Sequence, residues 1–460
     1  MPSLTQYDPQ DLNQLHKISA AEYIDRKLEI EKRVAYYNGE MKRWLVDPKT
    51  KKELDENVTI NVVQKIIDQS VSMLFGESPE IETHNTDIDM IVEKLEDTNF
   101  DDVFYNSLCA SGSISGHVFV KLVKVENTVR WVMMNPALVS VFWRPDDGKV
   151  VTAYKIQWID DKKEYRQDIV RLDDNNWLVR DLVRAGSNGL WELAADDVIW
   201  AYPFAPIVDW QNLPNYLGYY GKTDLNSLEL NDAINFTASN INLILKHHAH
   251  PKTIGTGVRT DQVKETAVQG FWAIENESAK VANLEMQSDL SSSMNYLSFL
   301  RGEFFSQQRA VDPNTFKDKV GQLTNFGLRV LFSDAIQKNA TKQLLYGYGI
   351  KELIYRSLVL MNVTIDPNTI DVDFTDPMPV NDKENAERVK IELESGVISK
   401  QTASEQLGYD WEEQSAEMAK EKAMSGVSLG NSLLDAMRKM DAENPADIGN
   451  MNNDAITEDA

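Results

Sequence analysis

Apolar and polar positions follow a helical period near the start of the chain. Between Ile60 and Phe75 the apolar residues recur every three or four positions, which places them on one face of a helix. Gly76 and Pro79 follow directly, and residues of these types commonly end helices. The stretch 18–44 also mixes charged and apolar residues as helices do. We therefore expect the first 75 residues to be mainly helical.

The period changes to that of β-strands between about residues 117 and 202. Residues with β-branched and aromatic side chains gather in short runs, and turn signals such as those at 145–148 and 186–189 separate the runs. Strands are expected at 117–125, 129–133, 139–143, 151–158, 169–172, 177–183 and 198–202. Because consecutive strands joined by short connections usually pair, we expect an antiparallel meander.

Helical spacing returns in two long stretches, 224–248 and 290–311. The segment between them, 251–286, predicts a small α/β module. Its parts are expected at 252–255 (strand), 260–268 (polar helix), 271–274 (strand) and 279–286 (strand). Such a module is too small to form a core of its own. We therefore expect an antiparallel helix pair that carries the module between its two members.

The rest of the chain predicts further helices. A loop at 312–319 leads into a mostly helical stretch, 320–361, and a strand pair follows at 363–374. Kinks in the helical stretch are expected at Gly321, Gly327, Gly347 and Gly349. Short helices are expected at 382–395, 399–407 and 412–424, before an acidic, flexible tail at 425–460. The predicted fold class is α+β, mainly helical, with an antiparallel β-rich region and a small α/β module.

Composition narrows the possible functions. Acidic residues outnumber basic ones, 72 to 47, which gives a formal net charge of −25. Such a chain is a poor candidate for gripping nucleic acid through a broad basic face. Cys109 is the only cysteine, which excludes an internal disulfide, and we expect it to be a small core residue. No apolar run approaches the roughly 18 residues that cross a bilayer, and no signal peptide begins the chain, so we expect a soluble protein in a reducing compartment.

One series of carboxylates, Asp371, Asp373 and Asp376, suggests possible catalysis. Carboxylates can hold the metal ions of a nuclease, so a metal-dependent enzyme acting on DNA is an alternative function. No His or Lys lies close to them in the sequence to complete such a site. A solvated strand edge is the better interpretation. We expect no catalytic, cofactor-binding or metal-binding residues and a chain that is not an enzyme.

Four stretches occur in an informative order. Val71–Pro79 ends a helix, and 220–235 leads into the first long helix. The third stretch, 224–361, is the series of long helix, small module, long helix, loop and kinked helix. The last is Ser395–Ala403, followed by Glu412 and an acidic helix. In this order and spacing, across about 70–424, the chain resembles the portal proteins of tailed bacteriophages with long tails.

The resemblance implies a ring, usually of twelve chains, at one vertex of a capsid. Double-stranded DNA would pass through the ring during packaging and ejection. The implied parts are a wing (1–220), two stem helices (221–250 and 287–311), a clip (251–286), a tunnel loop (312–319), a kinked helix with a β return to the wing (320–381), a crown (382–424) and the tail (425–460).

The resemblance also implies partners. The terminase large subunit and head–tail adaptor proteins would dock on the ring, which would contact the major capsid and scaffolding proteins. No cofactor and no membrane would be involved. The protein would be assembled in the cytoplasm of a host bacterium and reside in the virion. An acidic scaffold or adaptor protein that forms no ring is a further alternative.

Three sets of residues are candidates for these roles. The tunnel loop would present Asp312, Asn314, Thr315, Lys317 and Lys319 to the DNA. The first stem helix would line the lumen with neutral polar residues, Asn226, Asn231, Asn235 and Asn242, because a channel in which a duplex slides must not bind phosphates strongly. The candidate adaptor contacts of the clip are Arg259, Asp261, Lys264, Trp272, Glu275 and Glu277.

Overall fold

The chain divides into two units, residues 1–378 and residues 379–460. The structure is a computed structural model. It describes residues 4, 6–47, 49–144, 146–147, 150–186, 189–249, 253–256, 271–274, 280–283, 290–315, 325–378, 382–409, 411 and 414–420.

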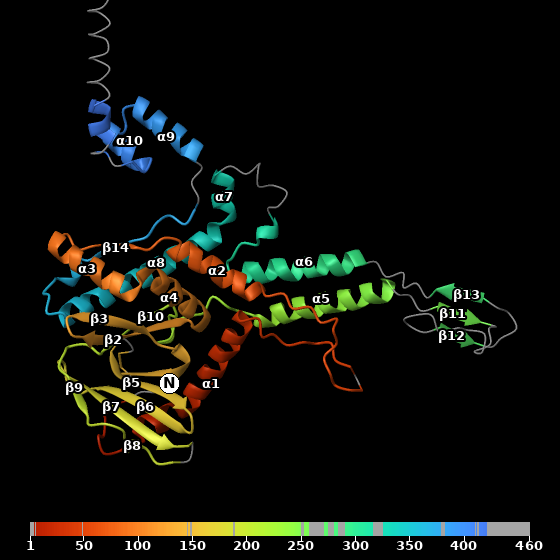
Figure 1. Cartoon of the computed structure of the whole chain (residues 1–460), viewed down its shortest axis with the longest axis horizontal. Helices are drawn as coiled ribbons and strands as arrows, with labels where there is room; N and C mark the ends of the chain where they lie inside the picture. The colour runs from red at the N-terminus through yellow and green to blue at the C-terminus, as the bar shows by residue number, and fades with distance from the viewer. Residues whose placement is uncertain are drawn as a thin grey trace, which may run out of the picture. The chain divides into compact units, whose positions relative to one another are not determined.

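Helices in the first unit precede and follow its sheets (Figure 1). Their bounds are α1 (Gln14–Tyr37), α2 (Val62–Phe75), α3 (Thr86–Asn99), α4 (Asp101–Ser115), α5 (Leu228–Ala249), α6 (Leu290–Gln307), α7 (Asn325–Leu331) and α8 (Ser333–Leu360). The expected N-terminal helices are confirmed as α1 and α2. The side chain of Asn61 caps α2 by accepting a hydrogen bond from the backbone N–H of Gln64, 3.1 Å away. The apolar face of α2 is buried, including Val62, Ile66 and Leu74.

Two antiparallel sheets form the β-rich region. The larger has the order β4-β5-β6-β7-β8, with β9 also paired to β7, and the smaller has the order β10-β2-β3. The strands are β2 (His117–Val125), β3 (Thr128–Met133), β4 (Val139–Trp143), β5 (Val151–Asp160), β6 (Lys163–Arg171), β7 (Trp177–Ala185), β8 (Glu192–Leu193), β9 (Val198–Trp200) and β10 (Ile207–Gln211). The predicted meander is confirmed for β4 to β7, whereas β2 and β3 lie in a separate sheet with β10. Strands β8 and β10 were not predicted.

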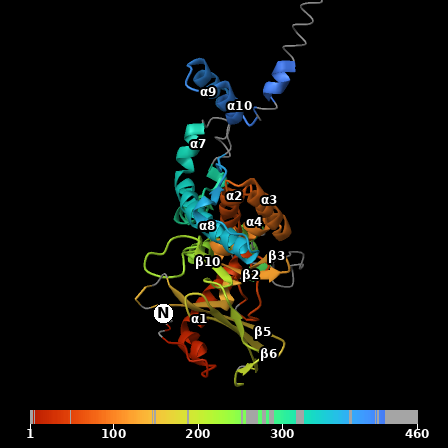
Figure 2. The same ribbon diagram turned by 90° about the vertical axis from the view of Figure 1, so that its left-hand side faces the viewer.

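These elements lie in three layers. Helices α3, α4 and α8 cover one face of the smaller sheet, with α2 packed on α4 and α8. The larger sheet lies on the other side of the smaller one, as Figure 1 and the side view in Figure 2 both show. One core cluster packs the helices on the smaller sheet and includes Tyr105, Trp210 and Tyr346. A second cluster joins the two sheets through Phe119 and Tyr154. Strand β2 is therefore buried on both faces at its start, which explains the consecutive apolar residues Val118, Phe119 and Val120.

One local prediction was wrong, and helix α4 was not predicted. The helix ends at Ser115, and Gly116 follows with a φ of +91°. Strand β14 (Asp371–Asp373) does not pair within 363–374; its partner is β1 (Glu80–Glu82). A partner almost 300 residues away leaves no local signal in a sequence.

The expected kinks in the helical stretch 320–361 are not at glycines in its described part. Helices α7 and α8 are separated at Phe332, and Gly347 and Gly349 lie inside the unbroken α8. Gly349 has a packing role instead. A Cβ atom built at this position would lie 2.3 Å from Cδ2 of Trp210, so the helix approaches the indole ring as closely as only glycine allows.

The second unit contains α9 (Asp382–Glu394) and α10 (Lys400–Gln406), and residues 414–420, within the helix expected at 412–424, are also helical. Ser399 caps α10, as its sequence predicts: its Oγ accepts a hydrogen bond from the backbone N–H of Thr402, 3.1 Å away. Val389 and Ala403 are the buried apolar residues of the pair.

We predict that Gly349→Ala lowers the free energy of unfolding by about 1–3 kcal/mol, because the added methyl group overpacks against Trp210. Gly347→Ala, in the same helix, is the matched control: its Cβ would be 3.4 Å from Phe374, and better helix propensity should make it neutral or stabilising by under about 1 kcal/mol. Urea unfolding followed by circular dichroism measures both. Equal effects of the two variants would contradict the close packing.

Candidate functional site

Helices α5 and α6 pack against each other and bracket the small strand module in the chain (Figure 1). Their shared core contains Ile234 from α5 and Leu300 and Phe304 from α6. The chain enters α5 through Ser227 and leaves α6 through Arg309, and both residues have positive φ values, +51° and +52°. The helix pair is therefore bounded by two sharp backbone turns.

The polar stripe of α5 binds another segment of the same chain. Residues 56–60 run along α5, where the backbone N–H of Ile60 donates to Asn235 Oδ1 (2.8 Å) and that of Val58 donates to Ser239 Oγ (2.9 Å). Farther along the helix, Asn242 Nδ2 donates to the carbonyl of Glu56 (2.9 Å). This ladder of hydrogen bonds from α5 side chains pairs the backbone polar groups of residues 56–60, which no neighbouring strand pairs.

The ladder corrects the prediction for the lumen. Asn231 and Asn235 are 0% and 2% exposed, and their amide groups contact the sulfur of Met41. They do not face an open surface, because the chain itself covers this side of α5. Asn242 is partly buried by the same segment, whereas Asn226 is exposed before the start of α5 and stays a candidate.

Hydrogen bonds join the residues before the start of α5 to the residue after the end of α6. Gln308 donates from its amide group to the carbonyl of Asn226, and the backbone N–H of Asn226 donates back to Gln308 Oε1 at 2.7 Å. Lys338 of α8 then donates to the carbonyl of Gln308 (2.9 Å). The reciprocal pair closes the base of α5 and α6, and Lys338 attaches this base to α8.

A buried ion pair lies beside this base. The Nζ of Lys342 is 2.6 Å from Asp224 Oδ2, and both side chains are 0% exposed. Lys342 also donates to Ser70 of α2 (2.8 Å) and Ser113 of α4 (2.7 Å), so all three of its protons have partners. The ammonium group of Lys342 in α8 therefore links the segment before α5 to α2 and α4.

The charge state of Asp224 follows from this arrangement. Burial raises its pKa, but Lys342 and Lys338 and the hydrogen bonds from Lys342 and Ser70 lower it more. The net effect holds the pKa of Asp224 well below its usual range. The carboxylate stays ionised in a site without solvent, where its interaction with Lys342 is strong.

Two predicted sets lie partly outside the described residues. Asp312 forms a two-point ion pair with Arg301 (2.5 and 2.9 Å), so it is engaged within the chain, and Asn314 and Thr315 lie in a short 3-10 turn. Lys317 and Lys319 are outside the described residues. In the strand module, β11 (Thr253–Thr256) pairs in parallel with β12 (Phe271–Ile274) and antiparallel with β13 (Lys280–Asn283).

The strands of the module therefore occur near their predicted positions. Trp272 lies in β12. The expected helix 260–268 and the other candidate contacts, Arg259, Asp261, Lys264, Glu275 and Glu277, are outside the described residues.

Two of the carboxylates considered for catalysis contact a basic side chain. Asp371 is 3.0 Å from Nε2 of His84, and Asp376 is 2.8 Å from Arg329. The histidine was missed because it follows β1, far away in the sequence. Across the described part of the chain, no group of three His, Cys, Asp or Glu side chains is placed to hold a metal ion. Cys109 is buried, as predicted, and burial raises the pKa of its thiol.

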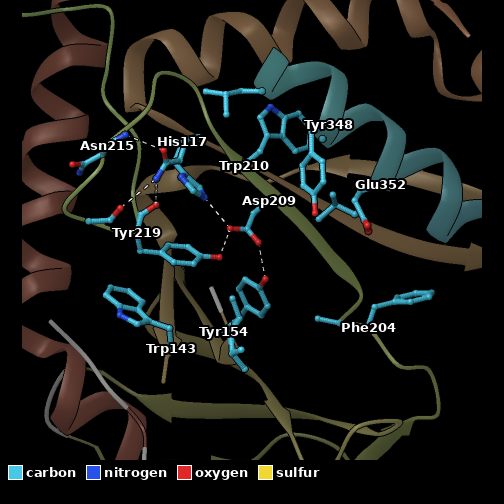
Figure 3. Close-up of a pocket in the computed structure, with 18 of the residues that line it drawn as sticks. His117, Trp143, Tyr154, Phe204, Asp209, Trp210, Asn215, Tyr219, Tyr348 and Glu352 are labelled. Carbon is cyan, nitrogen blue, oxygen red and sulfur yellow. Dashed lines mark hydrogen bonds and ion pairs between the residues drawn. The ribbon is translucent and has the colours of Figure 1, made fainter. Parts of the chain in front are cut away.

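A cavity of about 1090 Å³ lies between β10, β5 and α8, and no sequence motif predicted it. Figure 3 shows Asp209 at its floor, between His117 (2.8 Å), Tyr154 (2.6 Å) and Tyr219 (2.6 Å). Burial raises the pKa of Asp209, but the hydrogen bonds from these three donors lower it more. With every donor directed at one carboxylate, this network holds the two sheets and the loop before α5 together.

The fold combines two antiparallel sheets with a helix pair that has a buried ion pair beside its base. The family model of phage portal proteins, SPP1 Gp6-like, matches residues 16–427. The chain therefore belongs to this family of phage portal proteins. No curated protein matches the chain. Among the described helices, none combines the length and apolar content of a membrane span.

Solved structures with a similar outline come from gene transfer agent (GTA) particles. The neck of an empty particle, computed with C6 symmetry, has a TM-score of 0.48 and 10% identity and covers 76% of this chain and 90% of that chain. A native virion has a TM-score of 0.44 and 10% identity, covering 83% and 93%. The neck of a native particle, computed with C12 symmetry, has a TM-score of 0.44 and 11% identity, covering 82% and 98%.

We predict that Asp224→Asn lowers the free energy of unfolding by about 3–5 kcal/mol, because it leaves the charge of Lys342 buried without its partner. The double variant Asp224→Asn/Lys342→Met should lose less than the sum of the two single variants, by about 1–3 kcal/mol. Urea unfolding measures this coupling.

The pH dependence provides the control. Because the pKa of Asp224 is lowered on folding, its stabilisation is present above the ordinary carboxyl pKa and is lost as pH falls through the folded value. The difference between the wild type and Asp224→Asn should persist at neutral pH and shrink in strong acid. Additive single variants, or a difference that grows in acid, would contradict the buried pair.

Proposed function

We propose that this chain is the subunit of a portal ring of twelve copies at one capsid vertex, through which double-stranded DNA is packaged and ejected. Membership in the portal family over residues 16–427 carries this proposal. The family is structural rather than enzymatic, and its members are parts of phage particles. The proposed chemistry is correspondingly simple: the ring guides a duplex and makes or breaks no covalent bond.

The described elements support an assignment of parts. Helices α5 and α6 have the length, pairing and position in the chain that two stem helices need, and the strand module between them is proposed to be the clip. The sheets and α1 to α4 would form the wing, α8 would connect the stem to it, and α9 and α10 would belong to the crown. The clip would meet the terminase large subunit and, later, the head–tail adaptor protein. Major capsid and scaffolding proteins would surround the wing.

The acidic composition suits a conduit. DNA carries about one negative charge per 1.7 Å of helix axis, and a basic lumen would hold it by releasing counterions. A chain with a net charge of −25 instead repels the duplex over most of its surface. Lys317 and Lys319 in the proposed tunnel loop would then make weak contacts that break easily as the DNA moves.

We predict that the purified wild-type chain assembles into a particle with a mass about twelve times that of the 52.3 kDa chain. Native mass spectrometry measures the number of copies directly. A monomer or dimer at every concentration tested would contradict the ring and favour the acidic scaffold or adaptor.

We also predict that Lys317→Ala/Lys319→Ala leaves ring assembly intact but changes the rate of DNA packaging or the retention of packaged DNA. The reason is that the two charges would act on the moving duplex and not on the neighbouring chain. An in vitro packaging assay with nuclease-protected DNA measures the effect. Packaging indistinguishable from the wild type would show that the two lysines have no role in it.

A further inference from the structure

The segment between α1 and α2 concentrates positive charge in an acidic chain. Residues 42–52, which we call the basic loop, contain five cationic residues and one carboxylate, Asp47. The cationic residues, Lys42, Arg43, Lys49, Lys51 and Lys52, are all exposed. Arg43 pairs with Glu53 at 2.9 Å, whereas no carboxylate of the described residues forms an ion pair with Lys49, Lys51 or Lys52. The basic loop therefore has a local excess of positive charge, with Asp47 as its one negative side chain.

Hydrogen bonds give the basic loop a defined conformation. The carboxylate of Asp47 accepts from the backbone N–H of Lys49 and from the hydroxyl of Thr50, each at 2.8 Å. The backbone N–H of Asp47 donates to the carbonyl of Lys52 (2.8 Å), and Lys51 has a φ of +58°. A lysine rarely adopts this backbone conformation, so the hydrogen bonds around it must hold the turn.

The basic loop is also anchored to α5. The ring of Trp44 packs edge-on against Phe236 of α5, with ring centroids 5.9 Å apart, and the Nζ of Lys42 lies 3.9 Å from the centre of the Trp44 ring. Beside these cations, Val46 and Phe236 are 44% and 46% exposed. A surface that mixes exposed apolar groups with cations fits a protein partner better than a phosphate backbone, which offers nothing to an apolar side chain.

We propose that the basic loop of one copy docks on a carboxylate-rich surface of the neighbouring copy of the same chain. This inference rests on the proposed function, because it requires a ring. Every copy carries a net charge of −25, so copies brought together repel each other. A head-to-tail ring joins two unlike patches of the chain at every interface. A positive patch against the acidic surface of the next copy supplies the complementary charge that closure needs.

The test compares two pairs of adjacent, exposed lysines. Lys51→Glu/Lys52→Glu reverses the charge of the basic loop, and Lys162→Glu/Lys163→Glu, at the β5–β6 turn, makes the same change in net charge elsewhere. Mass photometry of the full chain over a concentration series gives the concentration of half-assembly. At low salt we expect the loop variant to need about tenfold more protein than the wild type, while the control variant assembles like the wild type.

Salt and a neutral variant separate charge from misfolding. The deficit of the loop variant should shrink at high salt, because screening weakens exposed ion pairs. Lys51→Gln/Lys52→Gln should give a smaller deficit than the charge reversal. Equal deficits in the loop and control variants, or no salt dependence, would overturn the proposal.

A DNA-binding measurement tests the competing possibility that the basic loop contacts DNA. Binding of a fluorescent duplex is measured for the same assembled particles. If the loop variant assembles like the wild type but binds the duplex more weakly, the basic loop contacts DNA and the proposal is wrong. If the wild type itself forms no ring, the proposed function fails, and this contact fails with it.

Discussion

Asp224 and Lys342 meet where the segment before α5 crosses α2, α4 and α8, and the position of the helix pair depends on their contact. Apolar packing of α5 on α6 tolerates many small shifts along the two helices, but a buried carboxylate needs its cation and hydrogen-bond donors in one arrangement. Lys342 meets this need with three donated hydrogen bonds, to Asp224, Ser70 and Ser113. Through Lys338 and Gln308 the same helix, α8, also holds the residue that follows α6. The start of α5 and the end of α6 are therefore both attached to one helix by polar groups, at the base of the proposed stem.

Much of the fold could be predicted because its signals are local. The strand runs between 117 and 202 and the long helices have apolar periods that can be read within ten or twenty residues. Helix α4 was missed because its last turns, with Gly112 and several serines, have low helix propensity, and packing against β2 and Tyr346 outweighs that preference. Gly349 was misread as a kink because the sequence does not show that Trp210, from a distant strand, lies against the helix.

The candidate site could be predicted only in part, for a related reason. The asparagines of α5 do form one polar face, as their spacing indicates, but spacing does not say what covers a face. Asn235 meets the backbone of Ile60 instead of a lumen. The basic loop and the cavity around Asp209 depend on contacts between segments far apart in the sequence, and no motif marks either one. The net charge of −25 predicts that the chain has no broad basic face for nucleic acid. This prediction does not depend on which residues are covered in the fold.

The central claim is that α5 and α6 of many identical chains surround an open axis. Electron cryomicroscopy of the purified assembly, reconstructed without imposed symmetry, tests it most directly. The account predicts an axial hole wide enough for duplex DNA, with the two helices of each copy arranged around it. A closed particle without a hole, or a ring in which α5 and α6 lie away from the axis, would contradict it.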